Sequence, residues 1–271
     1  MKPTIVDDAR DLPEGWMNLL RAILLQGRDY EVIEGSRAGE YRKTIDGFGF
    51  VKHPDHRPLA PLPRVGLPSP TTVDGIEEYF RDYLVREDGP PGSKAHYVYG
   101  KWLAPMIEWA AKYLASYGPG QAHCCLRVGD PFDAKQYDVD YKRPCPWCRE
   151  RNADPDCLMC KGTGFMKDEM KRITTPCLVN YSLQIVPEND GNFYLTHHIV
   201  YRSWDALNGW PENSGGFQRF KETVYELMQQ YEPFKWLPKD SKFLLGPYTW
   251  RCWDIHIYSE DLDAAKGWVG C

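Results

Sequence analysis

Two apolar runs rich in β-branched and aromatic residues follow one another in the second half of the sequence. The first is "CLVNYSLQIV", residues 177–186, and the second is "NFYLTHHIVYRSW", residues 192–204. Between them, "PENDGN" combines proline, asparagine and glycine, the residues that favour turns. Apolar, β-rich runs on either side of a short turn predict two strands of a sheet. Any fold for this chain must include that sheet.

Other segments show helical spacing of apolar residues and are mixed irregularly with further strand candidates. Helices are predicted at 14–27, 71–84, 101–118 and 213–231, and strands at 44–51, 122–128 and 242–259. The last helix is expected to begin at Asn213 or Ser214 as its cap. Residues 53–70 are too rich in proline for regular structure and predict a surface loop. Because helices and strands do not alternate strictly, the predicted fold class is α+β with a mostly antiparallel or mixed sheet.

Composition excludes several classes of protein. With 271 residues, 42% of them hydrophobic, the chain can bury a sizeable core. A net charge of −5 argues against a protein held on nucleic acid by bulk electrostatics. No apolar run approaches the length of a membrane span, and the polar N-terminus does not resemble a secretory signal. The nine cysteines are therefore expected to be thiols and metal ligands in the cytoplasm rather than disulfides.

Four of these cysteines form two C-x2-C pairs, "CPWC" and "CLMC", with eight residues between the pairs. They are Cys145, Cys148, Cys157 and Cys160. Two such pairs can surround one tetrahedral Zn²⁺, and the pattern resembles the zinc repeats of DnaJ-type chaperones. A closed shell of four thiolates leaves no open coordination position, which indicates a structural zinc that stabilises residues 144–165. The alternative is a contact with nucleic acid, but residues 138–172 carry eight basic and seven acidic side chains.

A second group of polar residues lies downstream of Cys177, in "YRSWDALNGWPENS". Arg202 and Ser203 together can hold a phosphate, and a nearby arginine would also favour the thiolate form of Cys177. The amide of Asn213 can donate and accept, which matches the O4 and N3–H edge of uracil. Later, "WDIHIYSED" places a histidine and a tyrosine on one face of a strand, where both can bind a hydroxyl. These are His256 and Tyr258.

Each residue of this group also has a purely structural alternative. Cys177 could be a small buried hydrophobic residue, and Arg202 a surface ion-pair partner. Asp205 and Asn213 could be turn and cap residues, sites that both residue types favour. His256 could be a hydrogen-bonded histidine of the core.

The pattern R-S-x-D-x-x-x-G-x-P-x-N at 202–213, the Pro-Cys before it and the terminal H-I-Y resemble thymidylate synthase and its pyrimidine hydroxymethylase relatives. Other motifs follow in the same order, and the resemblance extends from Trp16 to about Asp261. "RAG" resembles the family's phosphate-loop arginine at Arg37, "IEEYF" places its catalytic glutamate at Glu78, and "VYGKW" places its active-site tyrosine at Tyr99. The resemblance implies one catalytic domain over 1–271, with the zinc segment 144–165 inserted in it.

The resemblance further implies folate-dependent one-carbon transfer to C5 of a pyrimidine nucleotide. Cys177 would add to C6 of the base, and C5 would then attack the methylene group of 5,10-methylenetetrahydrofolate. Tyr99 and Glu78 would help to move protons at C5 and O4, and Asp205 would orient the folate pterin. Substrate-binding residues would be Arg37, Arg202 and Ser203 for the phosphate, Asn213 for the base, and His256 with Tyr258 for the sugar 3′-hydroxyl. For Glu78, an ordinary exposed carboxylate beside Glu77 is the alternative.

Several features of the family are missing. Leu178 stands where the family usually has histidine, and Ala122 and His123 stand where it has paired arginines that reach the phosphate across a dimer. The tryptophan loop that keeps water from the folate is not recognisable, although Trp102 or Trp147 could replace it. Because water and hydride compete for the exocyclic methylene on C5, the missing shield places hydroxymethylation of dUMP slightly ahead of methylation to dTMP.

The resemblance implies a homodimer formed through the sheet face, with a pyrimidine nucleoside monophosphate as substrate. Asn213, where an aspartate would suit cytosine better, favours uracil. Neither a membrane nor nucleic acid is expected as a partner; the divergence of the sequence suggests a bacteriophage enzyme working in the host cytoplasm. From another functional class, the alternative is a catalytically silent relative that binds a nucleotide or nucleic acid and uses the zinc segment for contact.

Overall fold

The computed structural model describes residues 3–32, 39–88, 98–129 and 176–270, together with 143–145, 148, 155, 157–158, 160, 162 and 165–166. The chain divides into two compact units. We call Met1–Val128 with Pro176–Cys271 the sheet unit, and Gly129–Thr175 the cysteine unit. The cysteine unit extends beyond the predicted zinc segment 144–165 on both sides.

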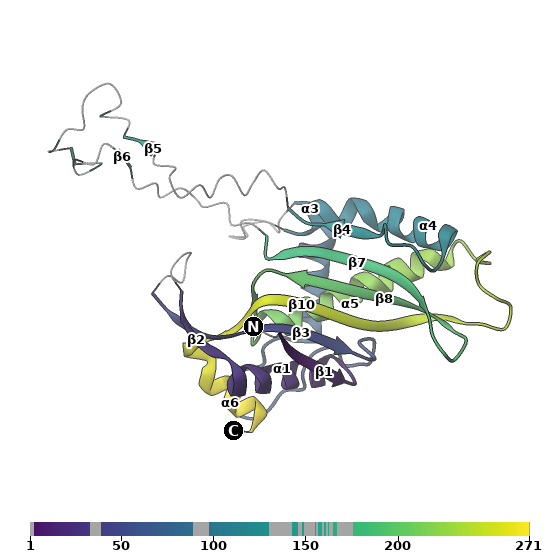
Figure 1. The fold of residues 1–271 in the computed structure, drawn as a ribbon, viewed down its shortest axis with the longest axis horizontal. Coiled ribbons are helices and arrows are strands. Elements are labelled where there is room, and N and C mark those ends of the chain that lie inside the picture. Colours follow the sequence, from purple (N-terminus) through teal and green to yellow (C-terminus); the bar gives the residue numbers. More distant parts are fainter. Residues whose placement is uncertain are drawn as a thin grey trace. The chain divides into compact units, whose positions relative to one another are not determined.

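An eight-stranded sheet forms the centre of the sheet unit (Figure 1). Its strands run in the order β1-β3-β10-β8-β7-β4, with β2 beside β3 and β9 beside β10. Their bounds are β1 Thr4–Ala9, β2 Arg28–Glu31, β3 Tyr41–Val51, β4 Cys125–Arg127, β7 Leu178–Pro187, β8 Phe193–Tyr201, β9 Trp204–Asp205 and β10 Phe243–Tyr258. The strands β7 and β8 are antiparallel neighbours, whereas β10 runs parallel to β8 and antiparallel to β3. The sheet is therefore mixed, and the predicted α+β class is confirmed.

Six α-helices accompany the sheet among the described residues. They are α1 Leu12–Gln26, α2 Val73–Tyr79, α3 Gly100–Leu103, α4 Ile107–Tyr117, α5 Gly209–Gln229 and α6 Leu262–Val269, and a π-helical turn at Phe80–Val85 continues α2. The start of α1 follows helix-capping rules, because Asp11 accepts from the backbone N–H of Glu14 at 3.0 Å and proline stands in the first turn. None of these helices has the length and apolarity needed to cross a lipid bilayer.

The helix α5 begins at Gly209 with Asn208 as its cap, five or six residues before the predicted cap at Asn213 or Ser214. A turn supplied by Asp205 explains the difference, because its Oδ1 accepts the backbone N–H groups of Leu207 and Asn208 at 2.9 and 3.1 Å. This earlier start places Asn213 inside the helix. Further along α5, a Cβ on Gly215 would lie 2.5 Å from the side chain of Ile76, so α5 packs closely against α2.

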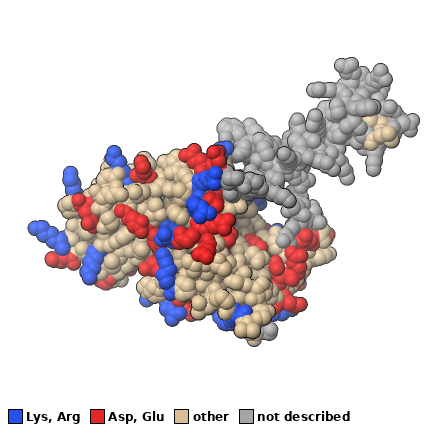
Figure 2. Space-filling view, turned by 180° about the vertical axis from the view of Figure 1, so that it is seen from behind, with Lys and Arg blue, Asp and Glu red and all other residues tan. Residues whose placement is uncertain are grey.

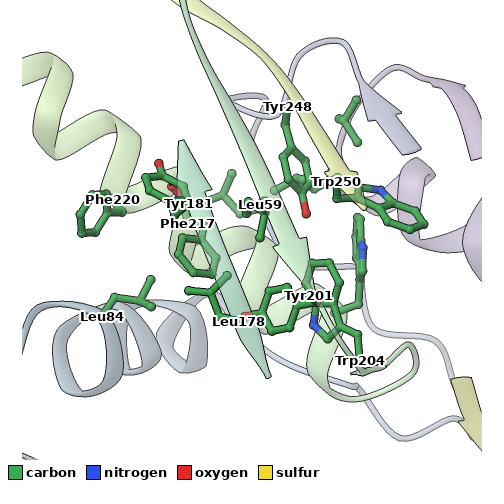
Figure 3. Close-up of a cluster of buried hydrophobic side chains, with 14 of the residues drawn as sticks. Leu59, Leu84, Leu178, Tyr181, Tyr201, Trp204, Phe217, Phe220, Tyr248 and Trp250 are labelled. Carbon is green, nitrogen blue, oxygen red and sulfur yellow. The ribbon is translucent and has the colours of Figure 1, made fainter. Parts of the chain in front are cut away.

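Aromatic side chains from α5 and from the strands β7, β8, β9 and β10 pack together in the core of the sheet unit (Figure 3). Tyr181 of β7 stacks on Phe217 of α5, with ring centroids 4.9 Å apart. Tyr201 of β8 and Trp250 of β10 are also buried. The predicted surface loop 53–70 contributes as well, because Leu59 is 2% exposed. Large rings bury much apolar area each and restrict one another's positions, so the core is a rigid support for side chains at its edge.

Lys221 of α5 is an ionisable side chain in this core, with 0% exposure. Its Nζ donates to the carbonyl oxygen of Gly246 at 2.5 Å. Burial lowers the pKa of Lys221 to about 7, and the carboxylates of Asp55 and Glu222 only partly oppose that shift. The folded chain therefore releases this proton at a lower pH than the unfolded chain, where a lysine has a pKa of about 10.4.

We expect the free energy of unfolding of the wild-type protein to rise relative to that of Lys221→Met between about pH 7 and about pH 9. Over this range the unfolded state binds a proton that the folded state has lost, so raising the pH favours folding by about 2 kcal/mol. Urea unfolding at several pH values measures the difference. Lys112→Met, at an exposed position of α4, is the matched control and should follow the wild type at every pH. Identical pH dependence in wild type and Lys221→Met would contradict the shift.

Candidate active site

Cys177 and Arg202 lie side by side at the adjoining ends of two neighbouring strands. Cys177 directly precedes β7, Arg202 directly follows β8, and the adjoining residues Leu178 and Tyr201 are partners in the ladder. The backbone N–H of Arg202 donates to the carbonyl oxygen of Cys177 at 2.9 Å, and its Nε donates to the carbonyl oxygen of Pro176 at 3.2 Å. Cys177 is half-buried and Arg202 is exposed. The fold thus brings the predicted nucleophile and a predicted phosphate ligand together at one strand edge.

Tyr99 contacts the first residue of β7 from the loop before α3. It directly precedes α3, is 7% exposed, and its hydroxyl accepts from the backbone N–H of Leu178 at 3.4 Å. Its ring meets Tyr201 edge-on, with centroids 6.4 Å apart. Burial raises the pKa of Tyr201 well above its usual range, and the hydroxyls of Tyr79 and Tyr99 beside it act in the same direction. Three tyrosine hydroxyls therefore gather next to the residue that follows Cys177.

Glu78 is exposed on α2. The contacts of the two residues next to it in the sequence show where it lies. The preceding residue, Glu77, forms an ion pair with Arg219 at 2.7 Å, and the following residue, Tyr79, is the one beside Tyr201. Burial raises the pKa of Glu212, a hydrogen bond with Thr71 opposes this, and the charge of Glu78 adds to the rise. Sequence reasoning missed Glu212, although it stands next to Asn213 in the recognised motif.

The side chain of Asn213 is oriented by a tryptophan. Trp204 donates its Nε1–H to Asn213 Oδ1 at 2.8 Å. The indole of Trp204 in turn stacks on Tyr201, with ring centroids 4.0 Å apart (Figure 3). A series of direct contacts therefore joins Asn213 to Trp204, Tyr201 and Tyr99, and so to the strand that follows Cys177.

A carboxylate that the sequence analysis did not single out organises the neighbouring strands. Asp254 of β10 accepts from the hydroxyl of Ser203 at 3.0 Å and from Thr44 at 2.7 Å, and it forms an ion pair with Arg42 at 2.7 Å. Ser203 therefore donates to a carboxylate in this structure. The signal that could have found Asp254 is its alternation with the two predicted sugar ligands in "WDIHIY", which places all three on one strand face.

His256 and Tyr258 lie next to each other on that face, as their spacing predicts, with ring centroids 4.7 Å apart. The Nδ1 of His256 lies 3.2 Å from the carbonyl oxygen of Asp254. Burial lowers the pKa of His256, the Asp254 carboxylate opposes that shift, and Arg42 adds to it. Its Nε2 is buried without a hydrogen-bond partner in the described part of the chain. A neutral imidazole with one unused nitrogen suits the binding of a hydroxyl group.

The remaining predicted residues are placed less directly at the site. The carboxylate of Asp205 holds the turn before α5, which is the structural alternative for this residue. Leu178 is fully buried in the core, so no polar side chain replaces the family's histidine there. Ala122 and His123 are exposed just before β4. Arg37 lies outside the described residues.

The four cysteines of the cysteine unit come together as predicted. Their Sγ atoms all lie within 4.8 Å of one another and are buried. The Cys145–Cys157 and Cys148–Cys160 separations are 3.8 and 3.6 Å. Zinc–sulfur bonds of about 2.3 Å in a tetrahedron require sulfur atoms about 3.8 Å apart, so these thiols fit one zinc ion. Beside them, β5 Arg143–Pro144 pairs antiparallel with β6 Phe165–Met166.

Comparisons with known proteins bear on the fold. No protein-family model and no curated protein sequence matches the chain. Among solved structures, the thermostable thymidylate synthase A from Bacillus subtilis aligns with 96% of this chain and 84% of its own. The TM-score is 0.54 and the sequence identity is 10%. Chains so different in sequence share an architecture when the alignment is this complete, and the sheet unit therefore has the thymidylate synthase fold.

Proposed function

We propose that this protein transfers a one-carbon unit from 5,10-methylenetetrahydrofolate to C5 of a pyrimidine nucleoside monophosphate, with dUMP as the substrate. The observation that carries the proposal is the position of Cys177, half-buried at a strand edge of a thymidylate synthase fold with Arg202 bound to its backbone. The sheet unit would be the catalytic domain. The cysteine unit would be an insert within it, stabilised by Zn²⁺.

The residues around Cys177 have the chemistry that this reaction needs. The thiolate would attack C6, and the electrons of the C5–C6 double bond would move toward O4, so that C5 becomes a nucleophile. Arg202 would bind the phosphate with Arg37, and with Ser203 once its hydroxyl turns from the Asp254 carboxylate to the phosphate. When bound, the folate supplies the carbon at the oxidation level of formaldehyde. C5 would form a bond to that carbon, and loss of the C5 proton, with Tyr99 and Glu78 assisting, would release tetrahydrofolate and leave an exocyclic methylene on C5. Water would add to this methylene and supply the hydroxyl of the product, and expulsion of the Cys177 thiolate would restore the double bond.

The base and sugar would be held by side chains whose positions suit those roles. Asn213 would pair with the O4 and N3–H edge of uracil. The buried Nε2 of His256, with Tyr258 beside it, would bind the 3′-hydroxyl. Asp205 would orient the pterin in addition to its role in the turn.

Hydroxymethylation is the product that we propose. The shielding tryptophan loop of the family is not recognisable in the sequence, and water can then compete with hydride for the activated carbon. Trp102 of α3, one candidate for a replacement shield, is half-buried and has the Lys101 ammonium 5.4 Å from its ring centroid. A charged, hydrated neighbour makes a poor barrier against water.

A homodimer formed through the sheet is part of the proposal. One face of the sheet is buried beneath helices, and Ile45 of β3 and Trp250 of β10 are among its buried side chains. Aromatic residues of the same strands lie outside this core, with Phe48 39% and Trp253 52% exposed. Exposed aromatic residues on a central sheet favour burial against a second copy of the chain.

A small nucleotide is a better partner for the sheet unit than nucleic acid. Figure 2 shows Lys and Arg side chains interspersed with Asp and Glu on the face in view. Binding of nucleic acid draws its strength from clustered positive charge that neutralises many phosphates. A single arginine such as Arg202 is sufficient for one phosphate group.

Release of tritium from C5-labelled dUMP, with and without methylenetetrahydrofolate, tests the reaction. Folate-dependent release together with a product heavier by one hydroxymethyl group, seen by mass analysis, is the expected result. A product heavier by one methyl group would correct the outcome to dTMP synthesis. No release from any pyrimidine nucleotide would refute the proposal and favour a silent binding protein.

We expect Arg202→Ala to weaken binding of dUMP by about tenfold to a hundredfold. A charge-assisted hydrogen bond to phosphate contributes about 1.5–3 kcal/mol to the binding free energy, and the variant loses this bond together with the guanidinium. Binding of deoxyuridine, which has no phosphate, should change much less, and calorimetric titration measures both. Arg10→Ala, at an exposed arginine paired with Asp11, is the matched control. An equal loss for dUMP and deoxyuridine would show that Arg202 acts on the fold and not on the phosphate.

A further inference from the structure

The amide of Asn213 has a defined orientation because an indole faces it. The Nε1–H of Trp204 lies 2.8 Å from Asn213 Oδ1. An indole nitrogen can only donate a hydrogen bond, so the atom facing it must be the amide oxygen. Rotating the amide by half a turn would place its NH₂ group against the indole N–H, two donors in contact. Trp204 therefore fixes which end of the amide is oxygen and which is nitrogen.

Trp204 is itself held firmly. Its side chain is 3% exposed, and its ring lies 12° from the plane of Tyr201 (Figure 3). Trp250 meets it edge-on, with ring centroids 6.2 Å apart. A Cβ on Gly209 would lie 3.7 Å from both Asn213 Oδ1 and the Trp204 ring, so no large group separates the two. Dense aromatic packing holds the Trp204 indole in place, and the fixed indole N–H in turn orients the amide of Asn213.

Along the edge that an amide would contact, uracil and cytosine present opposite patterns of hydrogen-bond donors and acceptors. Uracil has an N3–H donor beside the O4 acceptor, whereas cytosine has an N3 acceptor beside its amino donor. An asparagine that can rotate its amide matches either base by exchanging oxygen and nitrogen. An asparagine with a fixed amide matches one base and meets the other with donor against donor and acceptor against acceptor, which weakens binding.

We propose that Trp204 determines base specificity by making Asn213 selective for one of these two edges. The inference rests on the proposed function, which assigns Asn213 to the base and makes uracil the preferred one. Trp204 is a positioning residue, because it acts on the base only through the amide of Asn213.

The test compares dissociation constants for dUMP and dCMP, measured by calorimetric titration of the full chain. Wild-type protein should bind dUMP more tightly than dCMP, and the opposite preference would overturn the inference. Trp204→Phe keeps a ring to stack on Tyr201 but removes the N–H donor, so the ratio of the two constants should fall by about tenfold. Trp204→Leu also lacks the donor and serves if the phenylalanine variant does not fold.

Trp210→Phe is the matched control. Trp210 is a fully buried neighbour of Trp204, and its indole nitrogen has no hydrogen-bond partner among the described residues. Its replacement should leave the ratio unchanged. An unchanged ratio in Trp204→Phe, an equal fall in Trp210→Phe, or a wild type that binds both nucleotides equally would overturn the role of Trp204. A wild type that binds neither nucleotide would overturn the proposed function itself.

Discussion

Tritium release from C5-labelled dUMP should fall by at least about a thousandfold when Cys177 is replaced by alanine. The C5 hydrogen of a pyrimidine becomes exchangeable only after a nucleophile has added to C6, because addition turns the C5–C6 double bond into an enolate. Cys177 is the half-buried thiol at the strand edge where Arg202 binds. The thiol of Cys252 lies near Cys177 among the described residues, but it is buried and burial raises its pKa, so it would not take the place of Cys177.

Two measurements distinguish loss of the reaction in Cys177→Ala from loss of its fold. Binding of dUMP to Cys177→Ala should stay within a few-fold of wild type, because the phosphate and sugar ligands remain. Cys125→Ala removes an exposed thiol of β4 that is bound to Asn180, and it should retain full release. Release that survives in Cys177→Ala would assign the attack on C6 to another group and remove the basis of the proposed reaction.

The strands β3, β7, β8 and β10 were predictable because alternating apolar residues indicate burial of one face, whereas β1 and β2 were not predicted. On β7, Tyr181, Leu183 and Ile185 point inward and are at most 3% exposed, which is the period of two that the sequence shows. The start of α5 was not predictable by the same means. Asn213 and Ser214 have the chemistry of caps, but a turn supplied by Asp205 begins the helix earlier.

The residues of the candidate site also include some that the sequence could predict and some that it could not. Arg202 and Asn213 could be found because a motif with fixed spacing carries them, and Cys177 because a Pro-Cys pair precedes that motif. The network around Asp254 could not, because Thr44 and Asp254 are 210 residues apart and meet only through the register of β3 against β10. The contact of Trp204 with Asn213 depends likewise on tertiary packing, since nothing in local periodicity indicates which residue an indole N–H will face.

Replacing Cys145 with serine should reduce the zinc content of the protein from one ion per chain to almost none. The four cysteine sulfurs would share one ion, and a hydroxyl is a much weaker ligand for zinc than a thiolate. Structural zinc supplies on the order of 10 kcal/mol to small units that cannot build a core of their own. Among the described residues of the cysteine unit, the buried cluster consists of the four cysteines alone.

Elemental analysis and limited proteolysis measure the two consequences. Cleavage within 129–175 should become much faster in Cys145→Ser, whereas the sheet unit, which has a separate core, should melt within a few degrees of wild type. Cys125→Ser keeps all four proposed ligands and should retain both the zinc and the protease resistance. Because the two cores are separate, loss of zinc would leave the thiol chemistry of Cys177 intact if the insert is only structural. Loss of tritium release together with zinc would instead show that the cysteine unit takes part in the reaction.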